Sequence, residues 1–255
     1  MFYSDDMTYF SLGVQDNVNY RVDFYPDLKL QIPGGYGDYR IGAISKLVEL
    51  EHKPDLIRRA FSLATSSFID VYFYPSKTQV YYGGQPDESK RTDFGFSDIF
   101  LSNSNANFFD RLYIYLFLNQ KRQEQSSVIT HLPVRQHRGE PEFSQDDFTK
   151  KYLGYFYQNT FRQEKKNIQI LYGGNYINAD RIGTMLEGNG IRVSDLTYKA
   201  QKDKGCTVVE QVSPHSATAR AIATFFGCQL KQGFTDVYDI LFLLGDREKD
   251  WEVAD

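Results

Sequence analysis

The last third of the chain carries the pattern that most limits its fold. An apolar stretch at residues 168–172 ends in Gly173-Gly174, and a segment of helical spacing at 178–187 then stops at Gly188-Asn189-Gly190. A strand, a helix and glycine stops in this order are typical of a β-α-β unit. Further strands are predicted at 191–196, 206–211 and 237–244, with a helix at 216–226. Residues 166–255 are therefore predicted to form a small domain of order β-α-β-β-α-β. The run 240–244 is typical of a strand buried on both faces.

The first part of the chain predicts a second α/β domain at residues 1–160, with a mixed sheet arranged as a sandwich. Alternating apolar residues predict strands, and apolar residues three and four apart predict helices. Residues 133–141 show neither of these apolar spacings and predict an exposed connector. The polar residues 160–166 predict the domain boundary. The strands are predicted at 9–14, 20–25, 28–32 and 128–132, a hairpin at 68–74 and 78–82, and helices at 41–50, 55–64, 107–121 and 144–157.

Composition and charge exclude two classes of partner. The 255 residues include 29 basic and 33 acidic side chains and carry a net charge of −4, which gives no basic surface for nucleic acid. The longest apolar runs, such as residues 112–118, are far shorter than the ~20 residues that cross a bilayer. No nucleic-acid partner and no membrane span within the chain are expected.

The start of the chain leaves its compartment open. Met1-Phe2-Tyr3-Ser4-Asp5-Asp6 lacks the basic and apolar regions of a secretory signal. Read literally, this start favours a cytoplasmic protein. The alternative is an extracytoplasmic protein whose upstream anchor has been removed.

Aromatic residues are abundant, with 19 Tyr and 20 Phe. Many lie in runs such as residues 71–74 and 80–82, where a half-buried strand places successive rings on opposite faces. Packing within a sheet is one interpretation. The other is an aromatic platform for a sugar polymer, because tyrosine offers both an apolar ring face and a hydroxyl group.

The strand-to-helix turn of the last third is a candidate ligand site. Backbone N–H groups at such a turn can face an anion at the positive end of the helix, so Gly173, Gly174 and Asn175 are the predicted ligand-binding residues. Tight packing of the connection is the alternative. The loop Gly34-Gly35-Tyr36-Gly37 lacks the Lys-Ser/Thr pair of a phosphate-binding loop and predicts only a turn.

The chain has two cysteines and four histidines. Cys206 and Cys228 each precede an apolar stretch and are predicted to form a disulfide, with two buried thiols as the alternative. The histidines share no metal-ligand spacing, so no metal and no cofactor are expected. His215 beside Ser216 is not a catalytic triad, because sequence neighbours rarely face each other and no third group is indicated. The four histidines are His52, His131, His137 and His215.

Residues 166–255 resemble the C-terminal domain of the LytR-CpsA-Psr cell-envelope proteins. The resemblance rests on Ile168-Gln169-Ile170-Leu171-Tyr172-Gly173-Gly174, on Gly190-Ile191-Arg192-Val193 and on Asp239-Ile240-Leu241-Phe242-Leu243-Leu244-Gly245-Asp246. The family's usual opening is Leu-Asn-Gly-Thr, from which Tyr172, Gly174 and Asn175 depart. Upstream, residues 20–74 are more faintly similar to the family's catalytic domain.

The resemblance implies an active site that lacks some of the family's motif residues. The family transfers a phosphate-linked glycopolymer and carries Pro-Arg-Asp-Thr and Lys-Ile-Asn motifs, where this chain has Pro26-Asp27-Leu28 and Arg40-Ile41-Gly42. Asp27 and Arg40 are the remnant catalytic candidates, and Arg58 and Arg59 are candidate anion contacts. The alternative places Asp27 at a turn and the arginines on solvated surfaces.

The leading expectation is a non-enzymatic, extracytoplasmic envelope protein that binds or scaffolds wall polymer or another envelope protein. It follows from the resemblance and from the missing arginine of the first motif. An active glycopolymer phosphotransferase that uses Asp27 and Arg40 is the second hypothesis. A cytoplasmic interaction protein is the third.

Overall fold

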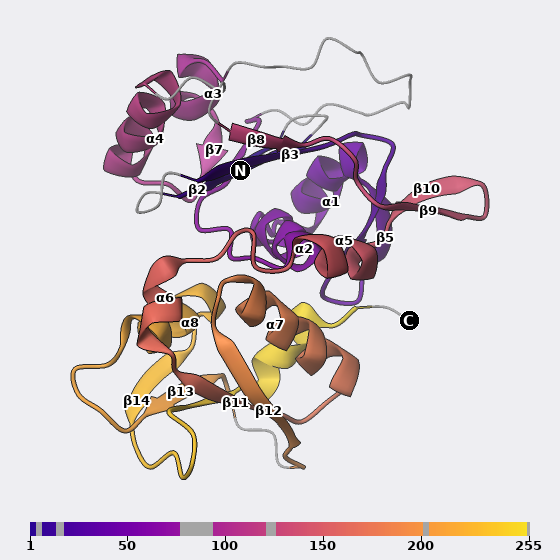
Figure 1. Ribbon diagram of the computed structural model, residues 1–255. Coiled ribbons are helices and arrows are strands. Elements are labelled where there is room, and N and C mark those ends of the chain that lie inside the picture. Colours follow the sequence, from indigo (N-terminus) through magenta and orange to yellow (C-terminus); the bar gives the residue numbers. More distant parts are fainter. Residues whose placement is uncertain (4–6, 14–17, 77–93, 121–125, 201–203, 254–255) are drawn as a thin grey trace. The chain divides into compact units, whose positions relative to one another are not determined.

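The chain has an α/β fold with several sheets, as predicted. The computed structural model describes residues 1–3, 7–13, 18–76, 94–120, 126–200 and 204–253 (Figure 1). Two compact units share the chain: unit 1 comprises Met1–Leu30, Asp38–Phe61 and Ile69–Ser144, and unit 2 comprises Gln31–Gly37, Ser62–Phe68 and Gln145–Asp255. The boundary predicted at residues 160–166 lies inside unit 2.

Unit 1 contains a six-stranded mixed sheet in the order β7-β6-β1-β2-β3-β8. The pairs β1-β2, β2-β3 and β6-β7 are antiparallel, while β1-β6 and β3-β8 are parallel. The strands are β1 (Phe2–Tyr3), β2 (Met7–Leu12), β3 (Asn19–Phe24), β6 (Phe73–Tyr74), β7 (Asn103–Ser104) and β8 (Ser126–Ile129). Of the predicted hairpin, only its first arm is described: it forms the short β6, which pairs with β1 and β7, while residues 78–82 lie outside the described part.

The helices of the first half follow their apolar spacing. In α1 (Ile44–Glu51), Ile44, Leu47 and Val48 face the interior, and His52 ends the helix in the left-handed conformation. A short 3-10 turn, η1 (Ile41–Ala43), precedes α1. The other helices are α2 (Asp55–Thr65), α3 (Phe96–Phe100) and α4 (Phe108–Gln120).

The connector predicted at residues 133–141 is wrong, because this segment forms a β-hairpin. Strands β9 (Val134–His137) and β10 (Glu140–Phe143) pair antiparallel. Arg138 and Gly139 between them both have positive φ, as a tight hairpin turn requires. Every residue of β9 is exposed, so the strand carries no apolar alternation. With β4 (Lys29–Ile32) and β5 (Gly37–Arg40) they form the sheet β5-β4-β10-β9.

The helix predicted at residues 144–157 is shorter, and the polar stretch after it is helical rather than a linker. Helix α5 (Gln145–Tyr152) ends before Gly154, whose φ of 79° breaks the helix. Helix α6 (Asn159–Glu164) then leads into unit 2's sheet, with Phe161 buried. Phe161 is the residue by which this helix joins the core of unit 2.

Unit 2 is built on a five-stranded sheet in the order β12-β11-β15-β13-β14 (Figure 1). All neighbouring pairs are parallel except β13-β15. Unit 2 has one strand more than the predicted order, because β14 lies between α8 and the last strand. The elements are β11 (Asn167–Tyr172), α7 (Tyr176–Gly188), β12 (Arg192–Tyr198), β13 (Thr207–Glu210), α8 (Ala217–Phe226), β14 (Gln229–Gln232), β15 (Ile240–Leu243) and the 3-10 helix η3 (Gly245–Trp251).

The core of unit 2 lies on one face of this sheet. Along β15, Ile240 and Phe242 are fully buried, whereas Leu241 and Leu243 are only partly buried. The prediction of a strand buried on both faces is therefore wrong. Helices α7 and α8 contribute Ile182, Met185, Ile222 and Phe226 to the same core.

The disulfide between Cys206 and Cys228 is present, as predicted. The two cysteines directly precede β13 and β14, whose first residues, Thr207 and Gln229, are paired neighbours in the parallel ladder. The bond therefore fixes the start of the edge strand β14 to the strand beside it.

Candidate functional site

The turn between β11 and α7 holds a carboxylate of the same chain. The Gly173 N–H donates to Glu248 Oε2 at 3.0 Å, and the Gly174 N–H donates to Glu248 Oε1 at 3.1 Å. Glu248 belongs to η3 and is only 3% exposed. The predicted anion position at this turn is thus occupied by an internal anion.

Glycine and asparagine have defined roles at this turn. A Cβ atom at Gly174 would lie 2.7 Å from Glu248 Oε1, so a larger residue would force the carboxylate to move. Asn175 caps α7, because its side chain accepts a hydrogen bond from the Ile177 N–H at 2.9 Å. Binding of an external ligand by Gly173, Gly174 and Asn175 stays a prediction, and an anion would have to displace Glu248.

Three tyrosines gather beside this turn, at the end of β11 and β12. Tyr172 ends β11, Tyr198 ends β12 and is its neighbour in the parallel register, and Tyr176 begins α7. Their rings meet edge to face, with centroids 6.1 Å apart for Tyr172 and Tyr176 and 5.7 Å apart for Tyr172 and Tyr198. We call these three residues the tyrosine cluster.

The tyrosine cluster is open to solvent although its base is packed. Tyr172 packs against the core of unit 2, while Tyr176 is 55% exposed and Tyr198 is 58% exposed. Ligands of open α/β sheets bind at the carboxyl ends of parallel strands, which is where these rings lie. Two exposed rings held by a packed third offer apolar faces and hydroxyl groups to a ligand.

The sequence pattern does not indicate Tyr176 or Tyr198 as site residues. The aromatic runs that suggested a platform were those at residues 71–74 and 80–82. Tyr72 and Phe73 in the first are buried, and the second lies outside the described residues. Tyr172 ends the strand predicted at 168–172, but Tyr198 lies beyond the strand predicted at 191–196 and Tyr176 lies before the helix predicted at 178–187. The cluster appears only with the observed bounds of β12 and α7.

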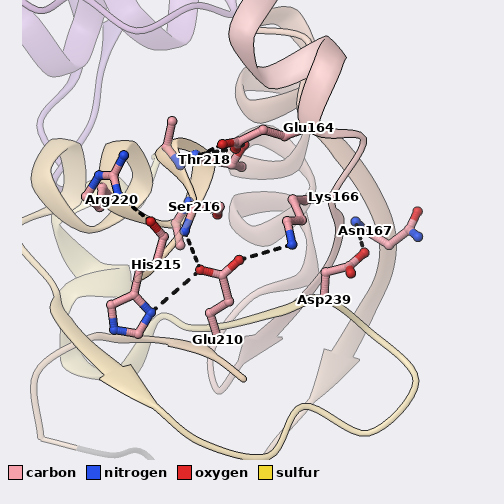
Figure 2. A network of polar contacts seen from close by, with 11 residues as sticks. Glu164, Lys166, Asn167, Glu210, His215, Ser216, Thr218, Arg220 and Asp239 are labelled. Atoms are coloured by element: carbon pink, nitrogen blue, oxygen red, sulfur yellow. Dashed lines mark hydrogen bonds and ion pairs between the residues drawn. The ribbon is translucent and has the colours of Figure 1, made fainter. Parts of the chain in front are cut away.

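A second group of polar residues lies at the other end of the strands of this sheet, where β11 begins and β13 ends (Figure 2). Glu210 at the end of β13 is 1% exposed, and its Oε2 accepts a hydrogen bond from the Ser216 N–H at 2.7 Å. Lys166 Nζ lies 3.4 Å from Glu210 Oε1, and His215 Nδ1 lies 3.6 Å from Oε2. Since Ser216 caps α8 by accepting a bond from the Ala219 N–H, this network fixes the start of that helix.

Glu164 also caps α8, from the end of α6. Its carboxylate accepts hydrogen bonds from the N–H groups of Ala217 and Thr218 at 2.8 Å each, and from the Thr218 hydroxyl at 2.6 Å. Burial raises the pKa of Glu164, but the bonds from Thr218 and Ala217 outweigh burial and hold that pKa below its ordinary value of 4.5. The ionised carboxylate therefore stabilises the folded state.

Glu164→Gln should lower the free energy of unfolding by about 1 kcal/mol at neutral pH, as for the loss of a helix cap. Above pH 4.5 the carboxylate is ionised in both states and its contribution is complete. As the pH falls from there through the lower folded pKa, the unfolded state takes up the proton first and the contribution disappears. Urea unfolding at neutral pH and near pH 3 tests this.

The control for this prediction is Gln163→Ala, an exposed neighbour on α6. It should leave the free energy of unfolding almost unchanged at both pH values. A deficit of Glu164→Gln that persists undiminished in acid would show that the charge of Glu164 is not responsible.

The remnant catalytic candidates lie together in unit 1, but within a set of ion pairs. Arg40 lies 4.0 Å from Asp27 and donates to Glu140 at 2.7 Å. Lys29 also binds Glu140. Hydrogen bonds from Lys29 and then from Arg40 hold the pKa of Glu140 below its usual value. Catalysis by Asp27 and Arg40 stays a prediction, at a position where Arg40 already donates to Glu140.

The candidate anion contacts Arg58 and Arg59 both bind Asp55 at the start of α2. The Arg58 Nε lies 2.6 Å and the Arg59 Nε 2.9 Å from the carboxylate of Asp55. Burial alone would raise the pKa of Asp55, but the hydrogen bonds and charges of the two arginines hold it below its usual value. Each guanidinium group is thus engaged with an internal acid.

Within the described part of the chain, no three His, Cys, Asp or Glu side chains are grouped as metal ligands. Among the histidines, His215 approaches Glu210 and His137 lies 3.7 Å from Glu142. The described residues include no helix with the length and apolar character needed to cross a membrane.

Comparisons with family models, with curated proteins and with solved structures find no match to this chain.

Proposed function

We propose that the chain is a non-enzymatic, extracytoplasmic envelope protein that binds the glycan of the cell wall through the tyrosine cluster. The observation that carries this proposal is the exposed, mutually braced set of Tyr172, Tyr176 and Tyr198 at the carboxyl ends of β11 and β12. The disulfide supports an oxidising compartment. The resemblance to the C-terminal domain of the LytR-CpsA-Psr proteins supports the cell envelope.

The chemistry of the tyrosine cluster fits sugar rings. The C–H faces of a sugar can stack on an aromatic ring, and tyrosine hydroxyls can exchange hydrogen bonds with sugar hydroxyls. Since Tyr172 packs on the core, the base of the cluster is ordered before a ligand binds, which lowers the conformational entropy that binding costs.

The neighbouring turn favours an uncharged sugar over a phosphate. The two N–H groups that would hold a phosphate already donate to Glu248. A phosphate at the turn would therefore meet a carboxylate instead of free donors. The glycan strand of the wall, rather than an attached anionic polymer, is the proposed ligand.

Cosedimentation with insoluble wall sacculi tests the proposal. We expect binding that depends little on salt and persists after the anionic polymer has been stripped from the sacculi. Tyr176→Ala and Tyr198→Ala should each weaken binding about fivefold, since one aromatic contact contributes about 1 kcal/mol.

The matched control is Tyr155→Ala, an exposed tyrosine of unit 2 outside the tyrosine cluster. It should bind as the unaltered chain does. Absence of sedimentation with stripped sacculi, or equal loss in the control and the cluster variants, would refute the proposal.

A further inference from the structure

Helix α4 in unit 1 carries apolar side chains around its whole circumference. One side packs on a small core of Phe2, Phe73 and Ile99, to which α4 contributes Ile114, Tyr115 and Leu118. Helix α3 lies beside it (Figure 1), where Phe96 and Phe100 contact Tyr115. Apart from a ring contact of Phe108 with Phe100, with centroids 6.2 Å apart, these contacts lie on one face of α4.

The other face of α4 is exposed and apolar. We call it the α4 face, and its members lie at positions i, i+1, i+4, i+5 and i+8 of one helix, which places them on a single stripe. Their exposed fractions are large for apolar side chains: Phe108 63%, Phe109 77%, Leu112 38%, Tyr113 51% and Leu116 46%.

The two charged residues of α4 are held away from this face by the protein's own backbone. Asp110 accepts a hydrogen bond from the Asn107 N–H at 3.0 Å at the start of the helix. The Arg111 guanidinium donates to the Ile99 and Ser102 carbonyls and lies over the Phe73 ring. The α4 face is therefore uncharged, although charged residues make up 24% of the chain.

We infer that the α4 face binds the α4 face of a second copy of this chain, in a twofold-symmetric dimer. A face without charge meets its own copy without like-charge repulsion, and a straight apolar stripe can pack on itself in antiparallel orientation. Five side chains, most of them aromatic and about half exposed, would bury on the order of 500 Å² per copy. The pair buries about 1,000 Å², the lower limit for a specific interface, so dissociation in the micromolar range is expected.

This inference is independent of glycan binding, because α4 belongs to unit 1 and the tyrosine cluster to unit 2. Sedimentation velocity of the full chain over a concentration series tests it. The unaltered chain should pass from monomer to dimer between about 1 and 100 μM. Phe109→Glu and Leu116→Glu should each weaken the dimer at least tenfold, because each buries a charge without a partner.

Leu50→Glu is the matched control, since Leu50 on α1 is 67% exposed and lies outside the α4 face. It should dimerise as the unaltered chain does, and far-UV circular dichroism checks that all variants fold. Leu112→Cys gives a second readout that does not depend on tolerating a charge. Oxidation should link two copies through position 112, whereas Leu50→Cys should stay unlinked. A chain that remains monomeric throughout the series would overturn the inference, and this is the result expected if the α4 face binds a different protein. Variants and control that dimerise equally would also overturn it.

Discussion

Gly188→Ala is expected to destabilise unit 2 by about 3 kcal/mol, although alanine is the better helix former. Gly188 is the last residue of α7, and a Cβ atom there would lie 1.8 Å from the carbonyl oxygen of Ser66. Ser66 belongs to the segment Ser62–Phe68, which is part of unit 2. The clash is with backbone, so no side-chain rotation relieves it.

The local structure holds Ser66 in place. The Phe68 N–H donates to the Asn189 side chain at 3.0 Å, and the Asn189 side chain donates to the Met185 carbonyl at 2.7 Å. The Phe68 ring stacks on Phe225 with centroids 4.2 Å apart. An added methyl group must therefore disrupt either α7 or this packed segment.

Gly183→Ala in the same helix is the matched control. Its nearest neighbours, on Ile170, Val193 and Leu196, lie at an ordinary 3.7 Å from the new Cβ position. Here the gain in helix propensity should dominate, so the free energy of unfolding should stay the same or rise by up to about 1 kcal/mol. Urea unfolding of both variants decides, and equal effects at the two glycines would contradict the close approach at Gly188.

Loss of the Cys206–Cys228 disulfide is the second large effect. The bond joins residues 22 apart, and the chain-entropy model gives a stabilisation of roughly 3 kcal/mol for a loop of this size. We expect the double variant Cys206→Ala/Cys228→Ala to lose about this amount. A reducing agent should lower the stability of the unaltered chain similarly and leave the double variant unaffected.

Alkylation under denaturing conditions checks the premise directly. Without a reductant the mass should show no added label, and after reduction it should show two. Two labels on the unreduced chain would mean that the cysteines are free thiols in solution.

Most strands and helices of unit 2 could be predicted from local patterns, because glycines mark where its helices end. Gly227 ends α8 at a φ of 67°, and Gly190 follows α7 at 86°. Strand β14 was missed because Gln229–Gln232 has one apolar residue, Leu230, and is an edge strand. Its place depends on pairing with β13 and on the disulfide.

In the candidate site, the contacts between sequence neighbours could be predicted, and the contacts between residues far apart in the sequence could not. The turn at Gly173-Gly174 and its geometry follow from a strand that meets a helix. Its occupant, Glu248, lies 75 residues further along the chain and arrives through η3, a helix without a periodic pattern. The neighbourhood of Tyr172 and Tyr198 likewise requires the parallel register of β11 with β12.

The hairpin β9-β10 was missed for another reason. All of β9 is exposed, and in β10 only Phe143 is buried, so hydrophobic alternation cannot reveal these strands. The residues Arg138-Gly139 offered one signal in the sequence, since a glycine in a two-residue turn between short polar segments is typical of hairpins.

Proton NMR of the tyrosine rings during titration with a soluble, uncharged wall-glycan fragment tests the central claim most directly. The rings of Tyr172, Tyr176 and Tyr198, assigned through single Tyr→Phe variants, should shift together and saturate, while the ring of Tyr155 stays unchanged. Saturable binding that shifts other rings and leaves these three unmoved would contradict the account, as would the absence of any shift at millimolar fragment.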